Sequence, residues 1–137
     1  MTLTSRELEL LGPELEELVG GSVREVRCPS GSALWLEVRV PGRNVRVLLE
    51  TAPNLGRVHL VTGKDAQRGR PTAFVMLLRK HVTGARVLAT SQLTGDRHWR
   101  LHLAQHDATW TLVFTWRRAG GNIFLLEDEA VRGSLHP

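Results

Sequence analysis

Alternating apolar and polar residues cover most of the chain, and this period of two predicts a protein built mainly from β-strands. The alternation is clearest over residues 33–40, where Leu34, Leu36 and Val38 fall on one face. Trp35 falls on the opposite, outward face, and we expect it to be exposed. The strands are expected at residues 22–28, 33–40, 45–49, 57–62, 85–93, 97–105, 109–117 and 122–126.

The N-terminal segment has helical periodicity instead. Thr4 followed three residues later by Glu7 matches a capping box, so a helix should begin there. Gly12-Pro13 should interrupt this helix, and a second helical piece should continue to Val19. Four leucines form one apolar stripe that should pack on the body of the protein: Leu8, Leu11, Leu15 and Leu18.

A second helix is predicted over residues 74–82 and should end at Gly84. His81 falls on its apolar face, and we expect a hydrogen-bonded core histidine there. Arg79 and Lys80 point outward in the last turn, where the helix dipole alone favours cations. They are therefore either solvated charges or the edge of a surface that binds something negative.

Together these elements predict an α+β fold in a single domain over residues 1–137. Most of the chain should form a β-sandwich of two sheets, with a helix at the N-terminus and one central helix. The hydrophobic fraction of 42% is sufficient for a core. No run of about 18 apolar residues and no signal peptide is present, so we expect no membrane span and a cytoplasmic protein.

Positive charge is concentrated in the middle of the chain. The net charge is +4, but residues 21–126 contain 16 basic residues against six acidic ones, while both ends are acidic. Arginine predominates over lysine, and its planar guanidinium group suits phosphate. The pattern indicates either an ordinary basic surface or a partner that carries phosphate.

Motifs for catalysis or cofactor binding are lacking. The sequence contains no P-loop, no GxGxxG and no GxSxG motif. Its single cysteine, Cys28, excludes an internal disulfide and a cysteine zinc cluster. His98, His102 and His106 recur every four residues, but this spacing spans about 13 Å along a strand, too far for one metal ion. We therefore expect no enzyme activity, no cofactor and no metal.

A series of short motifs runs in order along nearly the whole chain. It begins with LVGGSVREV after the N-terminal helix and continues with Pro71 and the run MLLRKH, followed by GARV. Asp96-Arg97 and the run NIFL from Asn122 complete the series. In this order the motifs resemble the N-terminal domain of the NFACT family, also labelled fibronectin-binding protein A.

The resemblance implies a function in ribosome-associated quality control. Full-length members of the family are cytosolic, bind the large ribosomal subunit carrying a stalled peptidyl-tRNA, and recruit tRNA to extend the nascent chain. The family's Asp-Arg pair contributes to tRNA engagement. The resemblance also implies a fold similar to the N-terminal β-sandwich of formamidopyrimidine-type DNA glycosylases. The candidate RNA-contacting residues are Asp96, Arg97, Arg79, Lys80, Arg117, Arg118 and Asn122.

Three departures from related sequences limit these implications. The glycosylases have a proline directly after the initiator methionine, whereas Thr2 stands here, so base excision is not implied. The chain ends at Pro137, so tail elongation by this chain alone is not implied. A Gly-basic-x-Ser-Asn run of the family is replaced by RAGGN, which keeps only Asn122.

Two functions follow as alternatives. The first is an RNA-binding module for tRNA or ribosomal RNA, with the large ribosomal subunit as a further candidate partner. The second is a protein-interaction module that kept the fold without RNA binding, which the altered loop and an exposed Trp35 would support. Asp96 and Arg97 also fit a tight turn in which the carboxylate accepts backbone N–H bonds, so their role in RNA contact is one of two interpretations.

Overall fold

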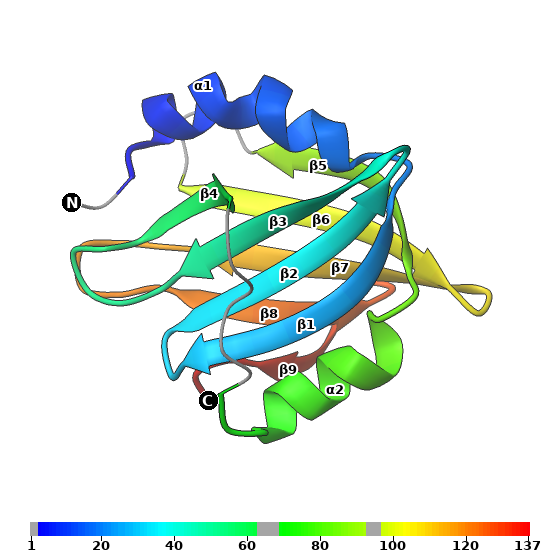
Figure 1. The fold of residues 1–137 in the computed structure, drawn as a ribbon. Helices are drawn as coiled ribbons and strands as arrows, with labels where there is room; N and C mark the ends of the chain where they lie inside the picture. The colour runs from blue at the N-terminus through cyan, green and yellow to red at the C-terminus, as the bar shows by residue number, and fades with distance from the viewer. Residues whose placement is uncertain (1–2, 63–68, 93–96) are drawn as a thin grey trace.

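The computed structural model describes residues 3–62, 69–92 and 97–137. These residues form nine strands, two α-helices and one short 3₁₀ helix (Figure 1). The elements are, in chain order, α1 (Ser5–Leu15), the 3₁₀ helix η1 (Glu16–Leu18), β1 (Ser22–Ser30), β2 (Ala33–Val40), β3 (Arg43–Glu50), β4 (Arg57–Val61), α2 (Ala73–His81), β5 (Arg86–Gln92), β6 (His98–Gln105), β7 (Ala108–Thr115), β8 (Asn122–Glu127) and β9 (Ala130–Ser134). All eight predicted strands are present, with ends within two residues of the predicted ones.

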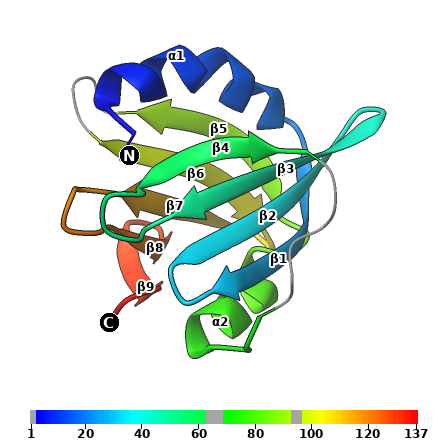
Figure 2. The same cartoon turned by 60° about the vertical axis from the view of Figure 1, so that its left-hand side comes forward.

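The strands form one antiparallel sheet that folds back on itself. Their order is β4-β3-β2-β1-β5-β6-β7-β8-β9. β1 and β5 share a single register pair, Ser22 opposite Arg86, and the sheet turns there. As a result β1–β4 lie over β5–β9 as two layers (Figures 1 and 2). The sheet-dominated α+β fold is therefore confirmed, and the two layers of the predicted sandwich belong to one hydrogen-bonded sheet.

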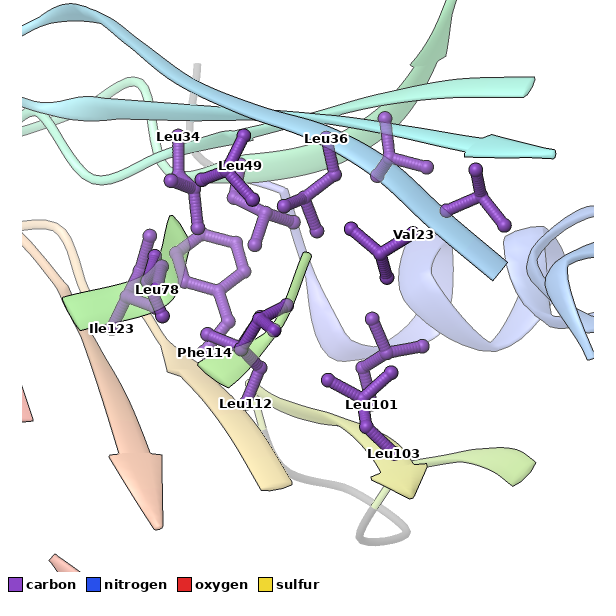
Figure 3. Packing of buried hydrophobic residues seen from close by; sticks show 14 of the residues in the cluster. Val23, Leu34, Leu36, Leu49, Leu78, Leu101, Leu103, Leu112, Phe114 and Ile123 are labelled. Carbon is purple, nitrogen blue, oxygen red and sulfur yellow. The ribbon is translucent and has the colours of Figure 1, made fainter. Parts of the chain in front are cut away.

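The apolar faces of the two layers meet in a single core. Leu34 and Leu36 from β2 point toward Leu112 and Phe114 from β7, and all four side chains are almost completely buried (Figure 3). Complete burial of such a side chain contributes about 1.5–3 kcal/mol. The alternation visible in the sequence is the direct result of this packing, because only one face of each strand enters the core.

The two helices cover the two open edges of the sandwich. α1 and η1 lie along the edge between β4 and β5, and α2 lies along the edge between β1 and β9 (Figures 1 and 2). The predicted leucine stripe of α1 faces inward, with Leu8, Leu15 and Leu18 buried. At the other edge a Cβ on Gly133 of β9 would lie 2.7 Å from Leu77 Cδ2, so the glycine permits α2 to pack closely.

The first helix is longer than the sequence predicted. Thr4 forms the expected capping box with Glu7, but the helix continues through Gly12-Pro13 to Leu15 instead of stopping near residue 11. Proline inside a helix costs about 3 kcal/mol. Pro13 is exposed, and buried leucines lie on both sides of it. Burial of Leu15 and Leu18 contributes about 3–6 kcal/mol, which outweighs this cost.

The last strand, β9, was not predicted. Asp128 and Glu129 adopt positive φ angles of 47° and 74° and form the turn of a β8–β9 hairpin, not an acidic tail. Turns with positive φ at both central residues usually contain Asn-Gly or Asp-Gly. β9 also carries only one large apolar residue, Val131, so neither its turn nor its alternation was visible in the sequence.

Trp35 lies on the outward face of β2, as predicted, but it is only 1% exposed. Its neighbours across the strands are Arg27 and Leu48, and the Arg27 guanidinium lies over the indole ring at 5.0 Å. The expectation of an exposed Trp35 was therefore wrong. Local periodicity identifies the face of a residue but does not reveal what covers that face.

Candidate functional site

Arg79 and Lys80 lie in the last turn of α2 but have different surroundings. Arg79 is half-buried, and its Nε donates a hydrogen bond to the carbonyl of Val26 on the free edge of β1 (3.2 Å). Lys80 is exposed. The prediction that both point outward therefore holds only for Lys80, because Arg79 joins α2 to β1.

The carbonyls at the end of α2 are capped from another strand. Gln105 Nε2, at the end of β6, donates to the carbonyls of His81 (3.2 Å) and Thr83 (2.8 Å). An amide that binds these carbonyls reduces the need for cations at this helix end. The dipole of α2 alone therefore does not explain why both Arg79 and Lys80 occupy its last turn.

His81 faces the interior, as its helical position predicts. Its ring stacks on Trp110 with the centroids 4.4 Å apart. Burial, together with the positive charges of Lys80 and Arg132, lowers the pKa of His81. The His81 ring is therefore placed by an aromatic contact, where a hydrogen bond had been expected.

Arg97, Arg117 and Arg118 gather at a different end of the sandwich. The carbonyl of Arg97 accepts from Trp116 N (3.3 Å), which brings the start of β6 to the end of β7. Arg117 and Arg118 follow β7 in an exposed turn, where the carbonyl of Arg118 accepts from Asn54 N (2.9 Å). Asp96 lies outside the described residues.

Asn122 uses its side chain within the protein. Its Nδ2 donates to the carbonyl of His136 (2.8 Å), while its Oδ1 accepts from the backbone N–H groups of His136 (2.9 Å) and Ile123 (2.8 Å). His136 Nε2 in turn lies 2.9 Å from Thr51 Oγ1. Asn122 therefore fastens the C-terminal segment, and nothing in its surroundings presents the amide to a partner.

The predicted candidates thus form two separate groups. The α2 group lies beside Gln105 at the end of β6, and the Arg97 group lies at the beginning of the same strand. A strand of eight residues is about 25 Å long. A partner that contacts both groups must span at least this distance.

The remaining predicted candidates have ordinary surroundings. His98 Nε2 accepts from Arg100 Nε (2.8 Å), and His102 Nε2 lies 2.9 Å from Ser91 Oγ. His106 is in the turn between β6 and β7. Burial raises the pKa of the Cys28 thiol. Within residues 3–62, 69–92 and 97–137, no three residues of metal-binding type are grouped.

Sequence reasoning missed a cluster of arginines where β1 meets β5. We name the arginine corner the set Arg24, Arg39, Arg79 and Arg86. Arg39 and Arg86 lie on either side of Ser22 in the strand register, and Arg24 and Arg79 line one shallow depression together with Glu25 and Thr83. Arg24 sits in a β-bulge between Val23 and Glu25, and a bulge redirects the side chain that it carries.

The arginine corner keeps its positive charge. The carboxylate of Glu25 is bound by Arg27, at 3.0 Å from Nε and 2.9 Å from Nη2. Arg39 Nη1 donates only to a neutral amide oxygen, that of Asn44 (3.3 Å). Arg24 and Arg86 are exposed and form no ion pair with a described carboxylate. The sequence signals were the motif positions of Arg24, Arg79 and Arg86 and the overall excess of arginine in the β-rich region, and none of these indicated that the four arginines lie together.

No helix among the described residues is long and apolar enough to cross a membrane.

Several known proteins are similar to this chain. Over 92 residues it is 30% identical to the Rqc2 homolog RqcH of Bacillus subtilis, covering 67% of this chain and 16% of that protein. Over 128 residues it is 26% identical to the archaeal Rqc2 homolog aRqcH of Methanocaldococcus jannaschii, covering 89% of this chain and 19% of the relative. The chain therefore spans less than a fifth of these curated relatives.

Solved structures share the fold. The N-terminal domain of fibronectin-binding protein PavA from Streptococcus pneumoniae superimposes with a TM-score of 0.91 and 24% identity, covering 98% of this chain and 54% of that one. The N-terminal part of the fibronectin/fibrinogen-binding protein from Streptococcus suis gives the same TM-score. The profile described as "NFACT N-terminal and middle domains" matches residues 8–132. With nearly the whole chain matched, the protein belongs to the NFACT family.

Proposed function

We propose that this protein is an RNA-binding module that associates with tRNA or ribosomal RNA in ribosome quality control. The support from relatives is the family membership and the Rqc2 homologs that share its sequence. Because the chain corresponds to less than a fifth of those relatives, the proposal concerns binding and not their complete activity. A cytoplasmic location follows from such partners. None of the relatives named above carries the name of an enzyme, and a non-enzymatic role is part of the proposal.

The observation that carries the proposal is the surplus of unpaired positive charge. Among the described residues, several exposed cations form no ion pair with a described carboxylate: Arg24, Arg70, Lys80, Arg86, Arg117 and Arg118. Acidic residues of α1 and η1 instead bind nearby groups, as Glu9 does with Arg6 and Glu17 with Arg43. Such cations displace the counterions condensed on RNA phosphates, and the release of these counterions favours binding.

The family's Asp-Arg pair remains part of the proposal. Arg97 is half-buried at the entrance of β6, where its backbone is fixed by Trp116. We propose that its guanidinium contacts RNA, as the family resemblance implies. Arg117 and Arg118 are exposed at the same end of the sandwich and would extend this contact. Asn122 is excluded from it because its amide holds the C-terminal segment.

The test is a titration of fluorescently labelled tRNA with the purified chain, followed by anisotropy at several salt concentrations. Four neutralised phosphates would weaken binding about 100-fold between about 50 and 200 mM salt. Arg97→Ala should weaken binding further without unfolding the protein. Absence of binding at about 50 mM salt, or binding that is insensitive to salt, would refute the proposal.

A protein-interaction module remains the second candidate. Buried Trp35 no longer supports it, but the large apolar side chain of Val131 on β9 is exposed. Leu126 lies beside Val131, which is 64% exposed, and Phe124 lies beside Val113. A partner bound there would show little dependence on salt, because apolar contacts release few counterions. The likeness to the glycosylase domain stays a prediction.

A further inference from the structure

We propose that the arginine corner binds phosphates of the backbone of a folded RNA; this inference rests on the proposed RNA-binding function and locates its contact. The corner combines arginines from two consecutive pairs of elements that are distant from each other in sequence: Arg24 from β1 and Arg39 from β2, with Arg79 from α2 and Arg86 from β5. Arg97, from the pair implied by the family resemblance, is not part of this group.

The spacing of the side chains suits a row of phosphates. Arg39 and Arg86 flank Ser22 in adjacent strands, so their backbones are about 10 Å apart. Gly84 N donates to the carbonyl of Val23 (2.7 Å), and this pairing makes Arg24 a diagonal neighbour of Arg86, about 7–8 Å away. Guanidinium groups on flexible stems at such separations can reach successive phosphates of one strand.

Folding alone does not account for these charges. Like charges on neighbouring strands destabilise a sheet, yet Arg24, Arg39 and Arg86 share one outward face. Arg79 is held through Nε by the carbonyl of Val26, and it lines the same shallow depression as Arg24. The carboxylate of Glu25, which lines the same depression, is already bound to Arg27. A polyanion would offset the remaining repulsion.

The aromatic residues indicate which part of the RNA is recognised. The chain has four tryptophans, three phenylalanines and no tyrosine. All four tryptophans are buried, as are Phe74 and Phe114, and Phe124 is half-buried. Recognition of unpaired bases uses exposed aromatic rings on which the bases stack. Without an exposed tryptophan, phenylalanine or tyrosine ring, the surface fits the sugar-phosphate backbone of folded RNA, which is read by shape and charge.

The experiment compares two double variants in the anisotropy titration with labelled tRNA. Arg24→Gln/Arg86→Gln removes two unpaired charges from the corner. Arg6→Gln/Arg132→Gln removes the same charge from arginines that are paired with Glu9 and Glu127, on α1 and β9. We expect the corner variant to bind about 10- to 100-fold more weakly than the wild type. Its slope of log Kd against log salt should fall by about two, whereas the control should change less than about twofold.

The outcomes separate this inference from the function on which it rests. If the wild type does not bind tRNA, the proposed function fails. If the wild type binds and the corner variant binds like the control, the function stands and the corner is refuted. Each variant should fold like the wild type, because all four substituted side chains are exposed. Thermal unfolding of each variant checks this.

Competition experiments test the class of ligand. An unlabelled duplex RNA should displace tRNA about as well as tRNA itself, and oligo(U) of equal length should be much weaker. Stronger competition by oligo(U) would overturn the inference that the backbone of folded RNA is recognised. The wild type and the corner variant are also tested with anionic phospholipid vesicles. If the corner variant loses vesicle binding but keeps tRNA binding, the corner binds a lipid surface, and the inference that it binds RNA is refuted.

Discussion

Asn122 tests whether a residue of the family motif acts on RNA or on the protein itself. Its side chain makes three hydrogen bonds, two with the backbone of His136 and one with Ile123 N. A typical hydrogen bond contributes a net 0.5–1.5 kcal/mol. Because His136 is only half-buried, water can replace part of the loss, and Asn122→Ala should lower the free energy of unfolding by about 1.5–3 kcal/mol.

The assay is thermal unfolding, combined with tRNA binding at a temperature where the variant is folded. For a domain of this size the expected loss corresponds to about 5–10 °C in Tm. Ser134→Ala is the graded control, because it removes one donor to the same His136 carbonyl (2.9 Å) and should cost about 0.5–1.5 kcal/mol. A variant of Asn122 with unchanged Tm but strongly weakened tRNA binding would refute the structural role and restore the RNA contact.

Three further outcomes are expected. Lys80→Ala should change the free energy of unfolding by less than about 0.5 kcal/mol, because its side chain is exposed. Arg79→Ala should lower it by about 1 kcal/mol, because the hydrogen bond to the Val26 carbonyl is lost. Urea unfolding of the two single variants checks both values. Gly121→Ser should destabilise by more than about 2 kcal/mol in the same assay, since a Cβ there would lie 2.2 Å from the Thr115 carbonyl oxygen. Burial lowers the pKa of His59 and His81 in the folded protein. As the pH falls below about 6.5, the ordinary pKa of histidine, the unfolded chain therefore binds more protons than the folded one. Stability should therefore fall as pH decreases from about 7 to 5.5, and His59→Gln should flatten this dependence; an equally steep slope in the variant would contradict the assignment.

The strands and helix ends were predictable because their signals are local. A strand with one buried face alternates, so β2 and β7 appear directly in the sequence. Thr4 and Gly84 mark helix ends through their own chemistry, a side-chain acceptor and a positive φ of 92°. Such features depend on residues within one turn of each other.

Features that depend on distant contacts could not be predicted in this way. The continuation of α1 past Pro13 requires the sheet on which its leucines pack. The burial of Trp35 depends on Arg27 from another strand. The family motif identified Arg79 and Lys80, but Arg24 and Arg86 become neighbours only through the β1–β5 pairing.

The single register pair between β1 and β5 has a consequence for how the chain folds. Apart from this junction, every pair of adjacent strands in the described sheet is also consecutive in sequence. The strands β1–β4 and β5–β9 can therefore each form early as local meanders, because short loops lose little entropy on closing. Joining Ser22 to Arg86 pairs residues 64 positions apart, and its entropic cost is reduced because much of the intervening chain is already ordered in the β1–β4 meander. Arg24 and Arg39 already lie together in the β1–β4 meander, so the closing step brings Arg86 beside them and the repulsion that it adds acts on the docking of the two meanders.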